Sequence, residues 1–208
     1  MSTVELPPMS LHDDGPRPGP SHPYRLTLDQ YRRLVDAGIL DGRKRVYLWD
    51  GILVEKMTKK PPHVIAQGSL LDETKALVPR GWYVGQDQPI EFPGANIPEP
   101  DLTIVRGRSR DYPDRPPLAA DVALVAEVSD SSLRFDQGEM LRAYAASAIP
   151  VYWIVNIPDA RIEVHTDPTG PAELPTYRKV EHHVAGQVVP LVLDGREVGR
   201  IAVADILP

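Results

Sequence analysis

The sequence predicts an α/β fold, in which a mixed β-sheet is flanked by helices and the C-terminal part is rich in β-strands. Segments with helical spacing of apolar residues occur before and between short apolar runs rich in β-branched residues. The stretch from Tyr177 to Leu207 has strand-like segments. Helices that alternate with strands in this way typically cover the faces of one sheet.

Length and composition are those of a globular protein. The chain has 208 residues, of which 42% are hydrophobic and 25% charged, enough for one domain with a real core. It has no cysteine, which excludes disulfides and thiolate metal sites. We find no membrane-length apolar run and no signal segment, so we expect a cytoplasmic protein. The net charge of −6 argues against a general nucleic-acid coat but permits a local basic face.

The first 22 residues differ from the rest of the chain. They contain five prolines and lack apolar periodicity, which predicts a disordered arm. We therefore expect an arm at residues 1–22 and a single domain at residues 23–208.

A helix is predicted to begin after Thr27. Thr27 and Gln30 have the spacing of a capping box, and Gly38 is a natural C-terminal stop. Residues Arg45 to Met57 predict a hairpin, because Asp50-Gly51 separates two apolar runs.

The rest of the chain alternates helical and extended patterns. In order, we expect a helix at residues 63–78, an extended pair WYVGQ and QPIEF, strands in PEPDLTIV and DVALVAEVS, a helix at residues 135–147, strands at 150–157 and 161–166, and short strands around Asp194-Gly195. We expect an early helix and the helix after Glu127 to pack on the sheet.

Two of these strands carry a misplaced carboxylate. Asp101 opens the first run, and Glu127 lies within the second. Burying an unpaired charge is costly, so such groups usually have a cation or a hydrogen-bond network beside them. If the strands are neighbours, Asp101 and Glu127 converge on one divalent ion; the alternative is an ordinary ion pair.

The ordered motifs resemble the Uma-type restriction endonuclease family of the PD-(D/E)XK nuclease superfamily, from about Tyr24 to the C-terminus. They are RLTLDQYRRLVDAGIL, DGILVEKM, PEPDLTIVRGR and DVALVAEVSDSSLRFDQGEMLRAYAASAIPVYWIV. The resemblance implies a restriction-endonuclease-like fold and a DNA endonuclease that hydrolyses phosphodiester bonds. It also implies that Asp101 and Glu127 bind Mg²⁺ or Mn²⁺. A homodimer is expected, because two symmetric sites cut two strands most simply.

The sequence departs from the family pattern at two positions. The family's lysine is expected on the helix after Glu127, where this chain has Met140. The family's first acidic residue is expected in the first strand, where this chain has Tyr47. Lys56 is the candidate replacement for the lysine, and Glu55 is a candidate third carboxylate. The alternative for both is a solvated strand end.

His63 and Gln88 match polar positions near the family's site, so we expect them to contact the substrate. Two other functions remain open. One is a catalytically inactive nuclease fold that binds DNA or a protein partner, which Met140 and Tyr47 favour. The other is a structural protein that uses the sheet only as a scaffold.

Overall fold

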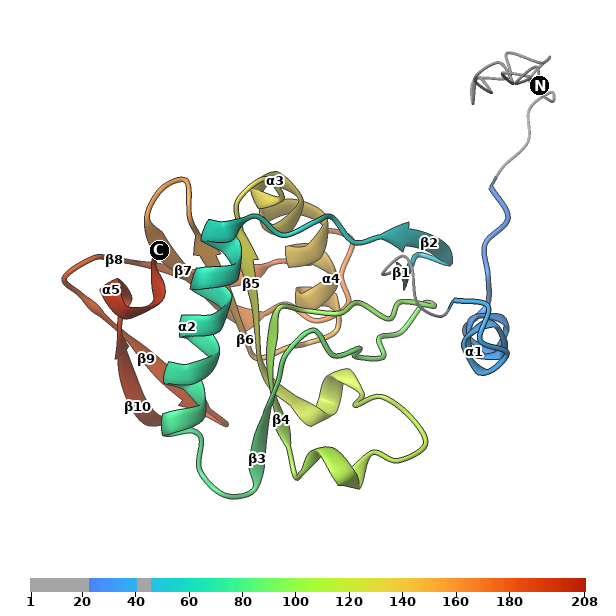
Figure 1. The fold of residues 1–208 in the computed structure, drawn as a ribbon, viewed down its shortest axis with the longest axis horizontal. Coiled ribbons are helices and arrows are strands. Elements are labelled where there is room, and N and C mark those ends of the chain that lie inside the picture. Colours follow the sequence, from blue (N-terminus) through green and yellow to red (C-terminus); the bar gives the residue numbers. More distant parts are fainter. Residues whose placement is uncertain (1–22, 41–45) are drawn as a thin grey trace, which may run out of the picture.

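The computed structural model describes residues 23–40 and 46–208 (Figure 1). The predicted arm at residues 1–22 lies outside the described residues. The helices are α1 (Leu28–Asp36), α2 (Pro61–Leu77), α3 (Leu133–Phe135), α4 (Leu141–Ala146) and α5 (Val203–Ile206). The strands are β1 (Val46–Trp49), β2 (Ile52–Glu55), β3 (Trp82–Gly85), β4 (Leu102–Arg106), β5 (Val122–Ser129), β6 (Val151–Asn156), β7 (Arg161–Pro168), β8 (Tyr177–Val184), β9 (Val188–Leu193) and β10 (Arg196–Ala202).

A six-stranded mixed sheet organises the fold, with the strand order β3-β4-β5-β6-β7-β8. Its central strands β5 and β6 are parallel, and the other neighbours are antiparallel. Parallel strands need a crossover connection, and the α3–α4 segment provides it. The predicted α/β class with a mixed sheet is confirmed.

The two faces of the sheet have separate cores. Leu124, Ala126 and Val128 point to one face, where α2, α5 and the β9–β10 hairpin pack. Val125 points to the other face, which α4 covers with Tyr144 and Ala145. Figure 1 shows α2 in front of the sheet. Because side chains alternate along a strand, Glu127 lies on the α4 face of β5.

The first helix and the first hairpin form as predicted. Thr27 Oγ1 accepts a hydrogen bond from the Gln30 backbone at 3.3 Å, and Gln30 Oε1 accepts one from the Thr27 backbone at 2.9 Å. Asp50 and Gly51 have φ values of 48° and 71°, as a tight type I′ turn requires. α1 packs beside this hairpin, away from the main sheet (Figure 1), so the early helix on the sheet is α2.

One predicted pairing is wrong. β3, in WYVGQ, pairs with β4 rather than with QPIEF. Asp87 has a positive φ of 50°, which turns the chain away after β3. The following segment bonds instead to residues 96–98, through Ile90 N to Pro98 O at 3.0 Å and Phe92 N to Asn96 O at 2.9 Å.

The helix after Glu127 contains an irregular turn. Residues Asp136–Met140 form a π-helical turn between α3 and α4, a feature that often occurs at functional sites. Within residues 23–40 and 46–208, no helix combines the length and apolar character that a membrane crossing needs.

Candidate functional site

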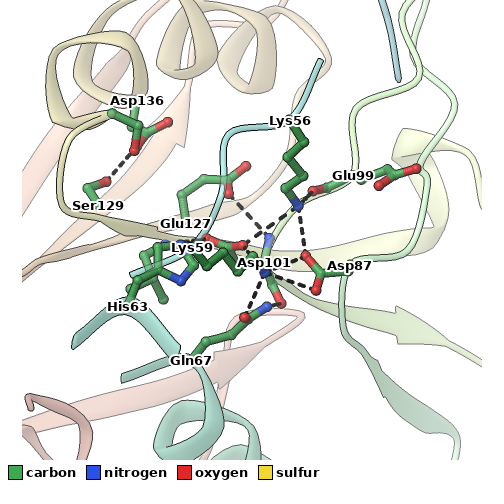
Figure 2. Close-up of polar contacts among 12 residues, drawn as sticks. Lys56, Lys59, His63, Gln67, Asp87, Glu99, Asp101, Glu127, Ser129 and Asp136 are labelled. Carbon is green, nitrogen blue, oxygen red and sulfur yellow. Dashed lines mark hydrogen bonds and ion pairs between the residues drawn. The ribbon is translucent and has the colours of Figure 1, made fainter. Parts of the chain in front are cut away.

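Asp101 and Glu127 lie side by side at the same end of neighbouring strands (Figure 2). The register that pairs Leu102 with Ala126 puts the preceding Asp101 opposite Glu127. The two residues are only 3% and 7% exposed. The Asp101 backbone N–H donates to Glu127 Oε2 at 3.2 Å, and the Val128 N–H donates to Asp101 Oδ2 at 2.9 Å. The strand pairing itself therefore fixes both carboxylates.

Three basic side chains surround the Asp101 carboxylate. Lys59 Nζ is 3.0 Å from Oδ1, Lys56 Nζ is 3.7 Å from Oδ1, and His63 Nε2 is 3.0 Å from Oδ2. Burial alone would raise the pKa of Asp101. The contact with His63 and the charges of Lys56 and Lys59 outweigh burial and hold the pKa below its usual value, so Asp101 is ionised.

The two lysines are held by further acceptors (Figure 2). Lys56 Nζ donates to Asp87 Oδ1 at 2.7 Å and to the Glu99 carbonyl at 2.6 Å. Lys59 Nζ donates to Asp87 at 2.8 Å and 2.9 Å and to Gln67 Oε1 at 2.7 Å. Gln67 in turn donates to the Asp101 carbonyl at 2.9 Å. This network fixes both ammonium groups beside Asp101.

The side chain of Lys56 carries a positive charge in this site. Burial alone would lower the pKa of the Lys56 ammonium, but Asp101, Glu127 and Asp87 raise the pKa above its ordinary value. Lys56 therefore stays protonated at neutral pH. A protonated amine can neutralise a phosphate oxygen but cannot accept a proton from water.

Glu127 has the opposite electrostatic environment. Burial, followed by the charges of Asp101 and Asp136, raises the pKa of Glu127 well above its usual value. Tyr144 donates to Glu127 Oε1 at 2.6 Å and orients the carboxyl group from α4. Two buried carboxylates this close favour the binding of a cation, because a cation relieves their repulsion.

A third acid, Asp136, lies on the π-helical turn. Ser129 and Ser132 donate to Asp136 Oδ2 at 2.7 Å and 2.6 Å. Burial is the largest influence, and it raises the pKa of Asp136 to about 6 despite these hydrogen bonds. Asp136 was not predicted from the sequence, although its partner Ser129 lies two residues after Glu127 and therefore on the same face of β5.

A cavity of about 490 Å³ opens onto this cluster. Its wall includes Asp101, Glu127, Asp136, Lys56, Lys59 and His63. Glu55, Tyr47 and Met140 also line it. Burial, followed by Glu127 and other carboxylates, raises the pKa of Tyr47 to about 12, so its phenol is neutral.

The structure brings together five of the six residues predicted for the site, namely Asp101, Glu127, Glu55, Lys56 and His63. Gln88 is not among the residues that line the cavity, and its Oε1 lies beside Gly85. Five residues of the site were not predicted from the sequence: Lys59, Gln67, Asp87, Asp136 and Tyr144. The position of Lys59 three residues after Lys56 is a signal that could have found it, whereas Gln67 gives no signal before the fold brings α2 to Asp101.

The carboxylates fit a small, hard divalent cation. Among the described residues, no group of three or more histidine or acidic side chains is placed to hold a metal. Mg²⁺ needs fewer protein ligands, because it keeps several waters and often binds through one or two carboxylates plus substrate phosphate. Asp101 Oδ1 is buried and makes no hydrogen bond, although Lys59 Nζ lies 3.0 Å away. Asp101 and Glu127 therefore form a suitable pair of ligands.

A mixed sheet that presents two buried carboxylates beside lysines places the protein in the restriction-endonuclease-like class of nuclease folds. The family model Uma2, described as "Putative restriction endonuclease", matches residues 28–204. The chain belongs to this family.

Structural comparison agrees on the fold. A crystal structure described as "a putative nuclease belonging to DUF820" from Anabaena variabilis matches with a TM-score of 0.60. The match has 13% sequence identity and covers 87% of this chain and 97% of that chain. No curated protein matches the sequence.

Proposed function

We propose that the protein is a Mg²⁺- or Mn²⁺-dependent DNA endonuclease that hydrolyses phosphodiester bonds. The observation that carries this proposal is the pairing of Asp101 and Glu127, which are buried, adjacent and directed into one cavity with Lys56 and Lys59. Asp101 and Glu127 are the proposed metal ligands. When bound, the ion would lower the pKa of a coordinated water and offset charge on the phosphate.

The chain's own side chains have separate roles in this proposal. Lys56 and Lys59 offset negative charge on the scissile phosphate, and their hydrogen bonds to Asp87 keep them in position. His63 orients Asp101 through its 3.0 Å contact and is the proposed substrate contact in the cavity wall. Tyr144 orients Glu127. Glu55 lies at the end of β2 in the same wall and is a candidate third carboxylate.

The test is cleavage of plasmid and oligonucleotide DNA with Mg²⁺, with Mn²⁺ or with EDTA. Glu127→Gln and Asp101→Asn should each lower the rate by roughly a hundredfold or more. Glu173→Gln changes an exposed carboxylate outside the cavity and is the matched control. Sedimentation of the 23.0 kDa chain, with and without DNA, tests the expected homodimer.

Met140 favours a second function. It is buried in the cavity wall where the family resemblance implies a lysine. A catalytically inactive nuclease fold that binds DNA or a protein partner is the alternative. Metal-dependent DNA binding without cleavage in any of these substrates would replace the enzyme proposal with this one.

A further inference from the structure

The cavity at Asp101 has an apolar part that phosphate chemistry does not explain. Tyr47, Val54, Met57, Phe135 and Met140 line it together with the charged side chains. Met57 is 71% exposed. A cavity wall that leaves apolar groups accessible beside a polar cluster is typical of a site for a ligand with both characters.

Two of the residues that line the cavity, Tyr47 and Phe135, form a continuous aromatic group with Trp49. The ring of Phe135 lies 5.8 Å from the ring of Trp49, and Trp49 lies 6.4 Å from Tyr47. Tyr47 and Trp49 come from β1, whereas Phe135 is the last residue of α3, more than 80 residues later in the sequence. Rings held by their neighbours offer flat surfaces at little cost in side-chain entropy.

A nucleotide has both characters that the cavity requires. Its phosphate can bind a cation held by Asp101 and Glu127, and the ammonium groups of the two lysines. Its base has an apolar face that stacks on aromatic side chains irrespective of base identity. The volume of about 490 Å³ is that of a small-molecule site and is far too small for a duplex.

A base inside a duplex is stacked between its neighbours and cannot enter such a cavity unless it is extruded. We infer that the cavity receives the unstacked base of the nucleotide next to the scissile phosphate, with Phe135 and Tyr47 as its stacking surface. The preferred substrate is then single-stranded DNA or a strand with a flipped-out base. This inference rests on the proposed nuclease function and specifies its substrate class.

The test measures binding of the full chain to labelled oligonucleotides, with Glu127→Gln as the background so that no cleavage intervenes. Three ligands of equal length are compared at one salt concentration: single-stranded DNA, the same strand with abasic residues, and the duplex. We expect single-stranded DNA to bind roughly tenfold or more tightly than either of the others.

Phe135→Ala should lose most of the preference for bases over abasic residues, while Leu174→Ala, at a 77% exposed position, should keep it. Phe135→Leu retains apolar volume without an aromatic face, so it gives the same test if the alanine variant is unstable. Equal affinity for normal and abasic strands, or equal affinity for duplex and single strand, would overturn the inference.

Cleavage by the wild-type chain separates this inference from the proposed function. Mg²⁺-dependent cleavage of duplex and single strand at equal kcat/KM, unaffected by Phe135→Leu, would overturn the base pocket and leave the nuclease standing. Binding that depends on the bases, without cleavage of any substrate, would support the pocket and overturn the nuclease.

Discussion

Lys56 and Lys59 place positive charge beside Asp101 in a chain whose helix after Glu127 has Met140 instead of a lysine. Both ammonium groups are largely buried and share Asp87 as an acceptor. A charge that is already desolvated and positioned stabilises a developing negative charge more than a solvated one does.

The first prediction concerns these two lysines. Lys56→Ala and Lys59→Ala should each lower kcat for Mg²⁺-dependent cleavage by roughly a hundredfold, because each removes a positioned charge. Single-turnover cleavage measures the effect, and Lys179→Ala on the exposed side of β8 is the control. Rates within about twofold of wild type for both lysine variants would refute their role.

The second prediction is a rescue at Met140. Met140 is 5% exposed and lines the same cavity, so a lysine introduced there would meet the carboxylates of the site. Met140→Lys alone should change the rate little, since Lys56 already supplies charge. In the Lys56→Ala background it should recover roughly tenfold in rate. An inactive wild type that gains cleavage on Met140→Lys would instead show that the fold lost only this group.

At the scale of elements, the π-helical turn brings Asp136 into the cavity. A regular helix would place this side chain elsewhere. Asp136 is held by Ser129 of β5 and by Ser132. The next residue, Gln137, donates to Glu163 of β7 at 3.0 Å and 3.1 Å. The turn is thus attached to the sheet at two points.

The third prediction is the pH dependence of stability that Asp136 confers. Its pKa of about 6 is above the unfolded value, so the protonated carboxyl favours the fold. That contribution is complete below about pH 4 and is lost as the pH rises through about 6. Asp136→Asn mimics the protonated form and should therefore stabilise the metal-free protein by about 3 kcal/mol at pH 8.

At pH 4 the same substitution should have little effect, because the wild-type carboxyl is largely protonated. Thermal unfolding in EDTA at the two pH values measures the difference, with the exposed Asp205→Asn as the control. A destabilised Asp136→Asn at pH 8 would contradict the prediction.

The fourth prediction concerns the β1–β2 hairpin, which carries Tyr47 and Val54 of the cavity wall. A Cβ added at Gly51 would lie 2.8 Å from Arg25 Cβ and 3.0 Å from the Leu26 carbonyl oxygen, at a φ of +71°. Gly51→Ala should therefore combine backbone strain with a steric clash.

Gly195 provides a matched comparison. It follows Asp194 in the β9–β10 turn at a φ of +75°, and an added Cβ would meet nothing within 4 Å. Gly195→Ala should cost about 1 kcal/mol from the backbone alone. Chemical denaturation should show a greater loss for Gly51→Ala, and equal losses would rule out the clash.

At the scale of the whole molecule, the proposed DNA substrate is a polyanion, and an acidic chain would bind it through a few local cations. The net charge is −6. Among the described residues, Lys56, Lys59, Lys60 and Arg134 are the lysines and arginines that line the cavity.

The fifth prediction follows from these four cations. The logarithm of the affinity for single-stranded DNA should fall with the logarithm of salt concentration with a slope no steeper than about −3, at about 0.7 per neutralised phosphate. Lys60→Ala removes a cation whose side chain is 64% exposed and should reduce the slope by about 0.7. A slope steeper than about −6 would require a second basic surface.

The sequence by itself determined most of the elements and the two central carboxylates. Local signals decide these features: the capping box at Thr27, the Asp50-Gly51 turn, and strands too apolar to accept Asp101 and Glu127 without a partner. Such signals act over a few residues, so the sequence contains them directly. The family motifs identified the same pair and the nuclease-like fold.

Only the tertiary structure decided which groups surround the carboxylates. The fold brings four residues to Asp101 and Glu127 from other parts of the chain. They are Lys59 from the loop before α2, Gln67 from α2, Asp87 from the turn after β3 and Tyr144 from α4. The predicted pairing of QPIEF with WYVGQ was wrong for the same reason. The choice between two possible strand partners depends on contacts far along the chain. Asp136 enters the cavity through a π-helical turn, and helical periodicity alone does not predict that change of pitch.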